Sequence, residues 1–307
     1  MNINPDYLIE RRRNKNQLIR WKIISLILIV TTLLAVGKKI PHNNLFGSIK
    51  ENRAKDHIVS VRIEEIIQED PDIIKKLNDI AEDKKVRAVL LGINSPGGSS
   101  VGAEMLYNAV RKISLNKPVV VVLGTVAASG GYMTALGGDY IIAHNSTITG
   151  SIGVIVQTTE ITNLAEKIGI TFNNFKSGNL KASPNPTEKL TSEVKEATME
   201  SIGEIYDYFI ELVALRRNLD IKYVRQIADG RVYSGRKALA LKLIDAVGDR
   251  TTALEWLYSA KNISRDLEII EKKLKPKDNL LDMLIEDFQM KIKSFFYKSL
   301  PSAQSLM

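Results

Sequence analysis

The chain has 307 residues, of which 44% are hydrophobic, and a formal net charge of +8. A chain of this length and apolar content can bury a substantial core, which excludes wholesale disorder. It has no cysteine, and its three histidines are His42, His57 and His144. Disulfide bonds, thiolate catalysis and cysteine-ligated zinc are therefore excluded, and we expect neither a metal nor a cofactor.

The positive charge is concentrated near the N-terminus. Before residue 40 the cationic and acidic side chains sum to 8 − 2 = +6, so the rest of the chain is nearly neutral. The residues concerned are Arg11, Arg12, Arg13, Lys15, Arg20, Lys22, Lys38 and Lys39, with Asp6 and Glu10. Basic residues around one apolar segment are typical of a membrane-topology signal, whereas nucleic-acid-binding proteins spread them over the folded surface. We therefore expect no nucleic-acid binding.

Residues 23–37 form an uncharged stretch of 15 residues that is flanked by lysines. As a helix it spans about 22 Å, and flanking lysines and Trp21 at the interface can make up the difference from the roughly 30 Å membrane core. We predict a transmembrane anchor here, with residues 1–22 cytoplasmic, 38–56 a linker and the body exported, because more cations precede the stretch than follow it. A cleaved signal peptide ending at the small residues 35–37 and a buried core helix are the alternatives.

The body alternates between strand-like and helix-like patterns. Predicted strands span residues 58–63, 86–93, 119–123, 140–143 and 151–156. Three helices are predicted. One spans residues 73–81, and one runs from Thr191 to about Arg217. Another starts at Ser100, whose hydroxyl is expected to cap it. Strands that alternate with helices predict a layered α/β domain built from βαβ units.

Two glycine-rich turns follow buried strands. In the first, Asn94–Gly98, glycines allow backbone amides to point outward at close range, as in an oxyanion site, although an ordinary strand-to-helix turn has the same pattern. In the second, Ala127–Tyr132, Ser129 lies between small residues at a strand-to-helix junction, as in a nucleophile elbow. The alternative is that the Ser129 hydroxyl merely caps the following helix.

These turns and the segments after them resemble the signal peptide peptidase A family, in its short single-unit form, which belongs to peptidase family S49 and the ClpP/crotonase superfamily. The further matching segments are Thr149–Val154, Lys176–Lys181, Asp229–Gly235, Ala238 and Leu243–Gly248. They follow the family's order over about residues 58–258. The resemblance implies a ClpP/crotonase-like serine peptidase domain of stacked ββα and βαβ units over residues 57–258.

The resemblance also implies a role for each site residue. Ser129 corresponds to the serine that attacks the peptide carbonyl, and Lys181 to the lysine that takes its proton. The amides of Gly98 and Gly130 would form the oxyanion hole, and Ser151 would hold the lysine amine. Ser99-Ser100 after the first turn and Met133 after Tyr132 depart mildly from the family and are expected to tune the substrate cleft.

A lysine base must lose a proton near neutral pH, which requires apolar surroundings to lower its pKa from an ordinary value of about 10.4. Leu180 and Ala182 beside Lys181 permit such a pocket. Lys176 is the second candidate in the same motif. A Ser-His-Asp site would have to use His144, for which a structural role is the simpler interpretation.

The resemblance implies an endopeptidase at the bacterial inner membrane that degrades cleaved signal peptides and other hydrophobic peptides, with its catalytic domain on the periplasmic side. Long family members are tandem duplications whose serine and lysine lie in different halves. This chain has one half, so we predict a homo-oligomeric ring in which Lys181 of one subunit serves Ser129 of its neighbour. A crotonase-type enzyme acting on acyl-CoA and a non-catalytic membrane scaffold are the alternatives.

A helical extension is predicted over residues 259–307. Its apolar stripe consists of Leu281, Leu284, Ile285, Phe288, Ile292, Phe295 and Phe296. Such a stripe is more often an oligomer or core contact than a helix on the membrane surface.

Overall fold

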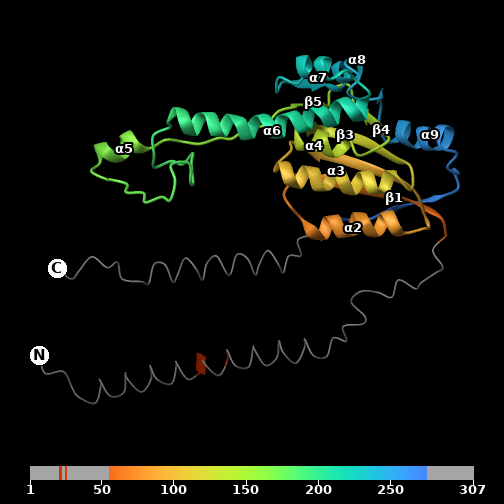
Figure 1. Ribbon diagram of the computed structural model, residues 1–307. Helices are drawn as coiled ribbons and strands as arrows, with labels where there is room; N and C mark the ends of the chain where they lie inside the picture. Colours follow the sequence, from red (N-terminus) through yellow and green to blue (C-terminus); the bar gives the residue numbers. More distant parts are fainter. Residues whose placement is uncertain (1–20, 23–24, 26–54, 275–307) are drawn as a thin grey trace, which may run out of the picture. The chain divides into compact units, whose positions relative to one another are not determined.

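Apolar, β-branched segments form an eight-stranded sheet in the part of the chain that the computed structural model describes, residues 21–22, 25 and 55–274 (Figure 1). The strands are β1 (His57–Glu64), β2 (Val86–Ser95), β3 (Val119–Ala128), β4 (Tyr140–Ala143), β5 (Ile148–Gly150), β6 (Val232–Ser234), β7 (Ala246–Val247) and β8 (Glu268–Glu271). The main order is β6-β5-β3-β2-β1-β8, and β4 pairs with β3 and β7. The strand pairs are parallel except for the antiparallel pair β5–β6.

Helices connect these strands. They are α2 (Pro71–Glu82), α3 (Ser100–Ser114), α4 (Gly130–Ala135), α5 (Thr162–Lys167), α6 (Ser192–Arg217), α7 (Ile221–Ile227), α8 (Gly235–Ala240) and α9 (Arg250–Ala260). Local sequence explains their starts: the Asp70 carboxylate accepts the amides of Asp72 and Ile73 at the start of α2, where Pro71 occupies the first turn. Thr191 caps α6 in the same way by accepting the Val194 amide.

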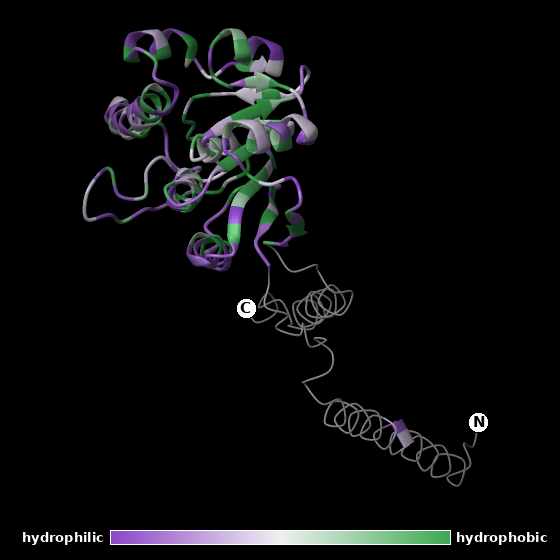
Figure 2. Cartoon of the chain, turned by 90° about the vertical axis from the view of Figure 1, so that its right-hand side faces the viewer, coloured by the Kyte–Doolittle hydropathy of each residue, from purple (hydrophilic) through white to green (hydrophobic). Residues whose placement is uncertain are grey.

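The sheet is buried on both faces. Val59, Val61 and Ile63 of β1 belong to a larger core that also includes residues of α2, α3, α4 and α6, whereas Ile58 belongs to a smaller core with α9. Figure 2 shows the hydrophobic residues gathered on the strands inside the domain. Each fully buried isoleucine or leucine contributes about 1.5–3 kcal/mol. The core therefore fixes where each strand ends, and with it the position of the turns that follow.

The predicted α/β class is confirmed, as is the helix over residues 192–217. Two local predictions are wrong. The residue that caps α3 is Ser99, whose hydroxyl accepts the Gly102 amide, and not Ser100. The strand predicted over residues 151–156 does not form, because Ser151 has a φ of 48° and turns the chain out of the sheet directly after β5.

Residues 153–190, here called the arm, separate β5 from α6 and include α5. Figure 1 shows the arm projecting away from the sheet, together with the first part of α6. We call residues 57–150 and 192–271 the sheet domain. Unlike that domain, the arm exposes most of its large apolar side chains. The exposed residues are Ile155, Val156, Ile161, Leu164, Ile168, Ile170, Phe172, Phe175, Leu180 and Leu190.

Most of the predicted anchor and the whole apolar stripe at the C-terminus lie outside the described residues. Of the anchor only Ser25 is described, and Trp21 beside it is helical and exposed. No helix among the described residues is long and apolar enough to cross a membrane. Within the predicted helical extension, residues 268–271 form a strand, β8, because Ile269 and Ile270 pair with the edge of β1.

Candidate active site

The first glycine turn follows β2 and is held by hydrogen bonds on both sides. The Gly97 amide donates to the Ser95 hydroxyl (3.1 Å), and the Ile67 amide donates to the Gly97 carbonyl (2.8 Å). The Ser99 amide in turn donates to the Ile67 carbonyl (2.9 Å). A β-carbon on Gly98 would lie 1.9 Å from the Ile67 oxygen, so only glycine fits between these bonds. The turn therefore has one well-defined conformation.

Ser129 occupies the junction between β3 and α4 in a backbone conformation that is rare for any residue with a side chain. Its φ is 54° and its ψ is −122°. Such a conformation costs about 1–3 kcal/mol and is concentrated at functional sites. The Ser129 amide donates to the Gly150 carbonyl (2.8 Å), but its side chain makes no capping hydrogen bond to α4. The interpretation of Ser129 as a helix cap is therefore wrong.

The two turns lie against each other. A β-carbon on Gly97 would lie 2.8 Å from the Gly130 nitrogen and 2.9 Å from Cβ of Ser129. A β-carbon on Gly130 would lie 3.4 Å from the Gly98 nitrogen. Neither the Gly98 amide nor the Gly130 amide donates a hydrogen bond within residues 55–274. Two free amides therefore lie close to the serine, which is the arrangement that an oxyanion hole requires.

Ser151 is placed beside Ser129 by the pairing of β5 with β3. Ala128 of β3 and Gly150 of β5 are neighbours across the sheet, and the Thr149 hydroxyl donates to the Ala127 carbonyl (2.6 Å). On its other side the Ser151 amide donates to the Arg231 carbonyl (2.9 Å). The Asp229–Gly235 motif thus has a structural task, which is to hold the segment next to the serine.

The helix after Ser129 is anchored by Tyr132. This side chain is fully buried, and its hydroxyl donates to the Leu243 carbonyl (2.8 Å). Burial raises the pKa of Tyr132, so the hydroxyl stays protonated and remains a donor. Residues of the Leu243–Gly248 motif therefore fix α4, and through it the position of Ser129.

Lys181 lies in the arm, outside the sheet domain that holds Ser129. Its side chain is exposed and has no hydrogen-bond or ion-pair partner in the described part of the chain. Its neighbours Leu180 and Ala182 are also exposed, so one chain alone does not form the expected apolar pocket. Lys176, in contrast, donates to the Ser183 hydroxyl (2.9 Å) and forms an ion pair with Glu188. The structure thus brings Gly98, Ser129, Gly130 and Ser151 together, and no contact among the described residues joins Lys181 to them.

His144 does not pair with Ser129. It lies exposed after β4 and lines a cavity of about 250 Å³ together with Arg62 and Arg250, and Ser129 is not among the residues of that cavity. Within residues 55–274, His144 therefore does not form a Ser-His-Asp arrangement with Ser129. Among the described residues, no three His, Asp or Glu side chains come close enough together to hold a metal ion.

A second cavity of about 250 Å³ lies beside α4, between α3 and α6. Met133, whose amide donates to the Ser129 carbonyl (2.9 Å), lies in its wall one helical turn from the serine. The other lining residues are Ser100, Val101, Glu104, Glu204, Ile205 and Tyr208. Sequence patterns alone missed the roles of Ile67, Ser95 and Tyr208. For Ser95 a signal exists, because serine next to Pro-Gly-Gly commonly bonds its own turn.

Residues 111–264 match the model of Peptidase family S49. The chain is 38% identical to MJ0651 of Methanocaldococcus jannaschii, which is named as a candidate protease. The alignment of 210 residues covers 68% of this chain and 67% of that protein. It is 38% identical over 201 residues to a protein of Enterococcus faecium named as a candidate signal peptide peptidase SppA, covering 65% of this chain and 58% of the relative. A solved structure, the 1510-N membrane-bound stomatin-specific protease in a mutant form, is similar with a TM-score of 0.47 and 15% identity over 73% of this chain and all of that one.

An α/β sheet domain with this family match defines the class of the protein, which is that of the peptidases. The chain belongs to peptidase family S49 and, within it, to the signal peptide peptidase A family.

Proposed function

We propose that this chain is a membrane-anchored serine endopeptidase in which Ser129 is the nucleophile and Lys181 the general base. The observation that carries the proposal is the strained backbone of Ser129 beside the free amides of Gly98 and Gly130. A serine held in this way presents its hydroxyl to a substrate instead of to its own helix. The two amides are then available for the negative charge that develops on the carbonyl oxygen.

The chemistry follows from these positions. The neutral amine of Lys181 takes the proton of the Ser129 hydroxyl, whose oxygen attacks the carbonyl carbon of the scissile peptide bond. The Gly98 and Gly130 amides stabilise the tetrahedral oxyanion. The lysine ammonium returns its proton to the leaving amine, and water then hydrolyses the acyl-enzyme. Ser151, beside Ser129, holds the lysine amine through its hydroxyl.

The base comes from a neighbouring subunit of a homo-oligomeric ring. Two observations support this arrangement: the arm that carries Lys181 projects away from the sheet domain (Figure 1), and its apolar side chains are exposed in the single chain. Phe175 is 97% and Ile155 is 80% exposed. Burying such side chains against a second copy is favourable, and it would also supply the apolar surroundings that a lysine base needs.

The substrates are hydrophobic peptides, among them signal peptides left in the membrane after cleavage. The cavity beside α4 supports this substrate class, since Val101, Met133 and Ile205 offer apolar walls and Met133 lies one helical turn from the serine. An anchor over residues 23–37 would hold the enzyme in the bacterial inner membrane with its N-terminus cytoplasmic and its catalytic domain periplasmic. The name of the Enterococcus faecium relative agrees with this substrate class.

A fluorophosphonate probe tests the proposal directly. The Ser129 oxygen should displace fluoride and form a covalent phosphonate ester, which peptide mapping by mass spectrometry locates. We expect labelling at Ser129 in the full-length chain, and sharply slower labelling in Lys181→Ala. A wild-type protein that hydrolyses no peptide and is not labelled at Ser129 would favour a non-catalytic scaffold.

A further inference from the structure

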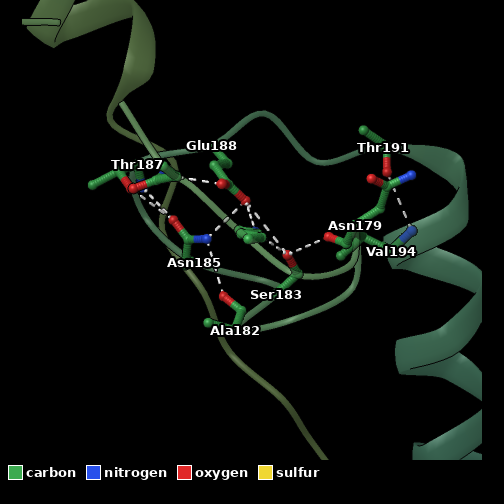
Figure 3. A network of polar contacts seen from close by, with 10 residues as sticks. Asn179, Ala182, Ser183, Asn185, Thr187, Glu188, Thr191 and Val194 are labelled. Atoms are coloured by element: carbon green, nitrogen blue, oxygen red, sulfur yellow. Dashed lines mark hydrogen bonds and ion pairs between the residues drawn. The ribbon is translucent and has the colours of Figure 1, made fainter. Parts of the chain in front are cut away.

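The carboxylate of Glu188 connects two segments of the arm. One oxygen accepts a hydrogen bond from the Asn174 side chain (2.9 Å). The other forms the ion pair with Lys176 and accepts from the side chains of Asn185 (2.9 Å) and Ser183 (3.4 Å). Figure 3 shows Ser183 and Asn185 pointing toward this carboxylate. We call these five residues the clamp.

The clamp closes on residues 177–182, here called the lysine loop. Asn174 and Lys176 precede the loop, whereas Ser183 and Asn185 follow it, so Glu188 ties its two ends together. Lys181 is the next-to-last residue of this loop.

Further bonds transmit the position of the clamp to the loop backbone. The Asn185 side chain donates to the carbonyl of Ala182 (3.0 Å), the residue directly after Lys181. Ala182 has a φ of 57°, a conformation that a residue with a side chain keeps only when its surroundings hold it there. Within the loop, the Lys181 amide donates to the Gly178 carbonyl (3.1 Å). The backbone on both sides of Lys181 is therefore held.

Polar contacts must hold the backbone of the lysine loop, because the loop has little apolar packing of its own. Residues 177–182 are exposed throughout, so burial does not fix their conformation. The clamp is better shielded: the Lys176 and Glu188 side chains are 16% and 30% exposed. A charged acceptor that gathers several donors forms a network whose members strengthen one another.

We infer that Glu188 is a positioning residue, which fixes the orientation of Lys181 by holding the two ends of the lysine loop. The inference rests on the proposed function of Lys181 as the general base. Among the described residues, none of the contacts of Glu188 is with Ser129. Its effect therefore falls on the step in which Lys181 moves a proton, and not on peptide binding.

The first test is Glu188→Gln in the full-length, assembled protein, compared with Glu166→Gln on the exposed surface of α5 as the matched control. A displacement of about 1 Å at a catalytic group can cost about 100-fold in rate, so we expect kcat to fall about 10- to 100-fold with KM changed less than about two-fold. Glu166→Gln should match the wild type in both constants. A Glu188→Gln enzyme that also matches the wild type would overturn the inference.

A second measurement separates positioning from a general structural role. The rate of fluorophosphonate labelling at Ser129 is compared for Glu188→Gln in the wild-type background and in the Lys181→Ala background. If Glu188 acts through Lys181, the substitution slows labelling about 10-fold or more in the first background and has no further effect in the second. An equal slowing in both backgrounds would contradict the inference.

A milder variant covers the case in which Glu188→Gln fails to assemble. Asn185→Ala leaves the ion pair of Lys176 with Glu188 in place and removes the Asn185 bonds to the Ala182 carbonyl and to Glu188. It should lower kcat by a smaller factor, about three- to ten-fold, again with little change in KM. Unchanged kcat in this variant, in protein that elutes as the wild-type oligomer, would also reject the inference.

Failure of the inference and failure of the proposed function give different results. If Lys181→Ala is inactive while Glu188→Gln and Asn185→Ala behave like Glu166→Gln, only the positioning role is wrong. If Lys181→Ala keeps full activity, the assignment of the base is wrong, and the inference falls with it.

Discussion

The sheet domain buries most of its large apolar side chains, whereas the arm exposes most of its own. In the sheet domain the strands are buried on both faces and the serine turn is locked by glycines that admit no side chain. In the arm most large apolar side chains face outward, and polar bonds around Glu188 maintain the local conformation. The proposed nucleophile and oxyanion hole thus lie within one sheet domain, whereas the proposed base lies in a segment whose apolar side chains are exposed in the single chain.

Ser129→Ala should have the largest effect, because it removes the hydroxyl that we propose as the nucleophile. We expect peptide hydrolysis to fall by roughly 10⁴-fold or more, with the Tm changed by less than about 2 °C, since glycines and backbone bonds set the turn. A peptide-cleavage assay and calorimetry measure both quantities. Ser146→Ala, at an exposed position outside the site, is the control. Appreciable hydrolysis by Ser129→Ala would place the nucleophile elsewhere.

Lys181→Arg tests whether the arm supplies a base or only a positive charge. A guanidinium does not lose its proton in proteins, so this variant should be as inactive as Lys181→Ala, about 10³-fold or more below wild type. Lys189→Arg, in the same arm, should retain activity.

The wild-type rate should rise with pH, because the lysine must be deprotonated to act. An optimum near pH 5, or an active arginine variant, would contradict a lysine base.

Phe175→Asp tests whether the exposed apolar face of the arm binds a second copy. A carboxylate at a side chain that is 97% exposed costs the single chain little, but it would be buried unpaired in an interface. We expect smaller particles in sedimentation and at least a ten-fold loss of activity, with the unfolding transition of the sheet domain retained. Leu115→Asp, at a residue 72% exposed on the sheet domain, should leave assembly intact. Equal effects of the two variants would remove the distinction between the regions.

Mixed oligomers show whether the arm serves its own sheet domain or a neighbour's. In rings assembled at random from equal amounts of Ser129→Ala and Lys181→Ala chains, roughly a quarter of shared sites combine an intact serine with an intact lysine. Such mixtures should regain about a quarter of the wild-type activity. Different affinity tags on the two chains establish co-assembly. Confirmed co-assembly without activity would mean that the pair acts within one chain.

Tyr132→Phe should have the smallest effect and should be confined to the sheet domain. It leaves the buried Leu243 carbonyl without its donor and should lower the free energy of unfolding by about 1–2 kcal/mol. Denaturant titration measures this change, and Tyr223→Phe, at a half-buried tyrosine, is the matched control. If the two variants are equally stable, the hydrogen bond does not anchor α4.

The sequence predicts the structure of the sheet domain better than that of the arm. The α/β class and the position of Ser129 follow from local patterns, since apolar runs form strands and small residues mark the junction after them. The strand expected over residues 151–156 does not form, because the chain turns out of the sheet at Ser151, which the local spacing of apolar residues does not reveal. The contacts of Ile67 with the first turn and of Arg231 with Ser151 depend on sheet register between distant segments, which local patterns do not encode.

The long helix α6 also shows that local patterns do not reveal contacts with distant segments. The stripe Val194, Ile202, Ile205, Phe209 and Leu212 predicts a helix correctly, but burial is concentrated in its second half. Ile205 remains 39% exposed and lines the cavity beside α4. Helical spacing identifies an apolar face, but it does not say what covers that face.

The antiparallel pairing of β5 with β6 has a consequence for how this fold can vary. Gly150 and Val232 are direct partners, so the chain leaves and rejoins the sheet at one place, as in a hairpin with a very long connection. The cost of closing a loop grows only slowly with its length. Insertions and deletions in the arm should therefore be tolerated by the sheet without shifting the serine. The length and shape of the arm can therefore vary without moving the turn that holds Ser129.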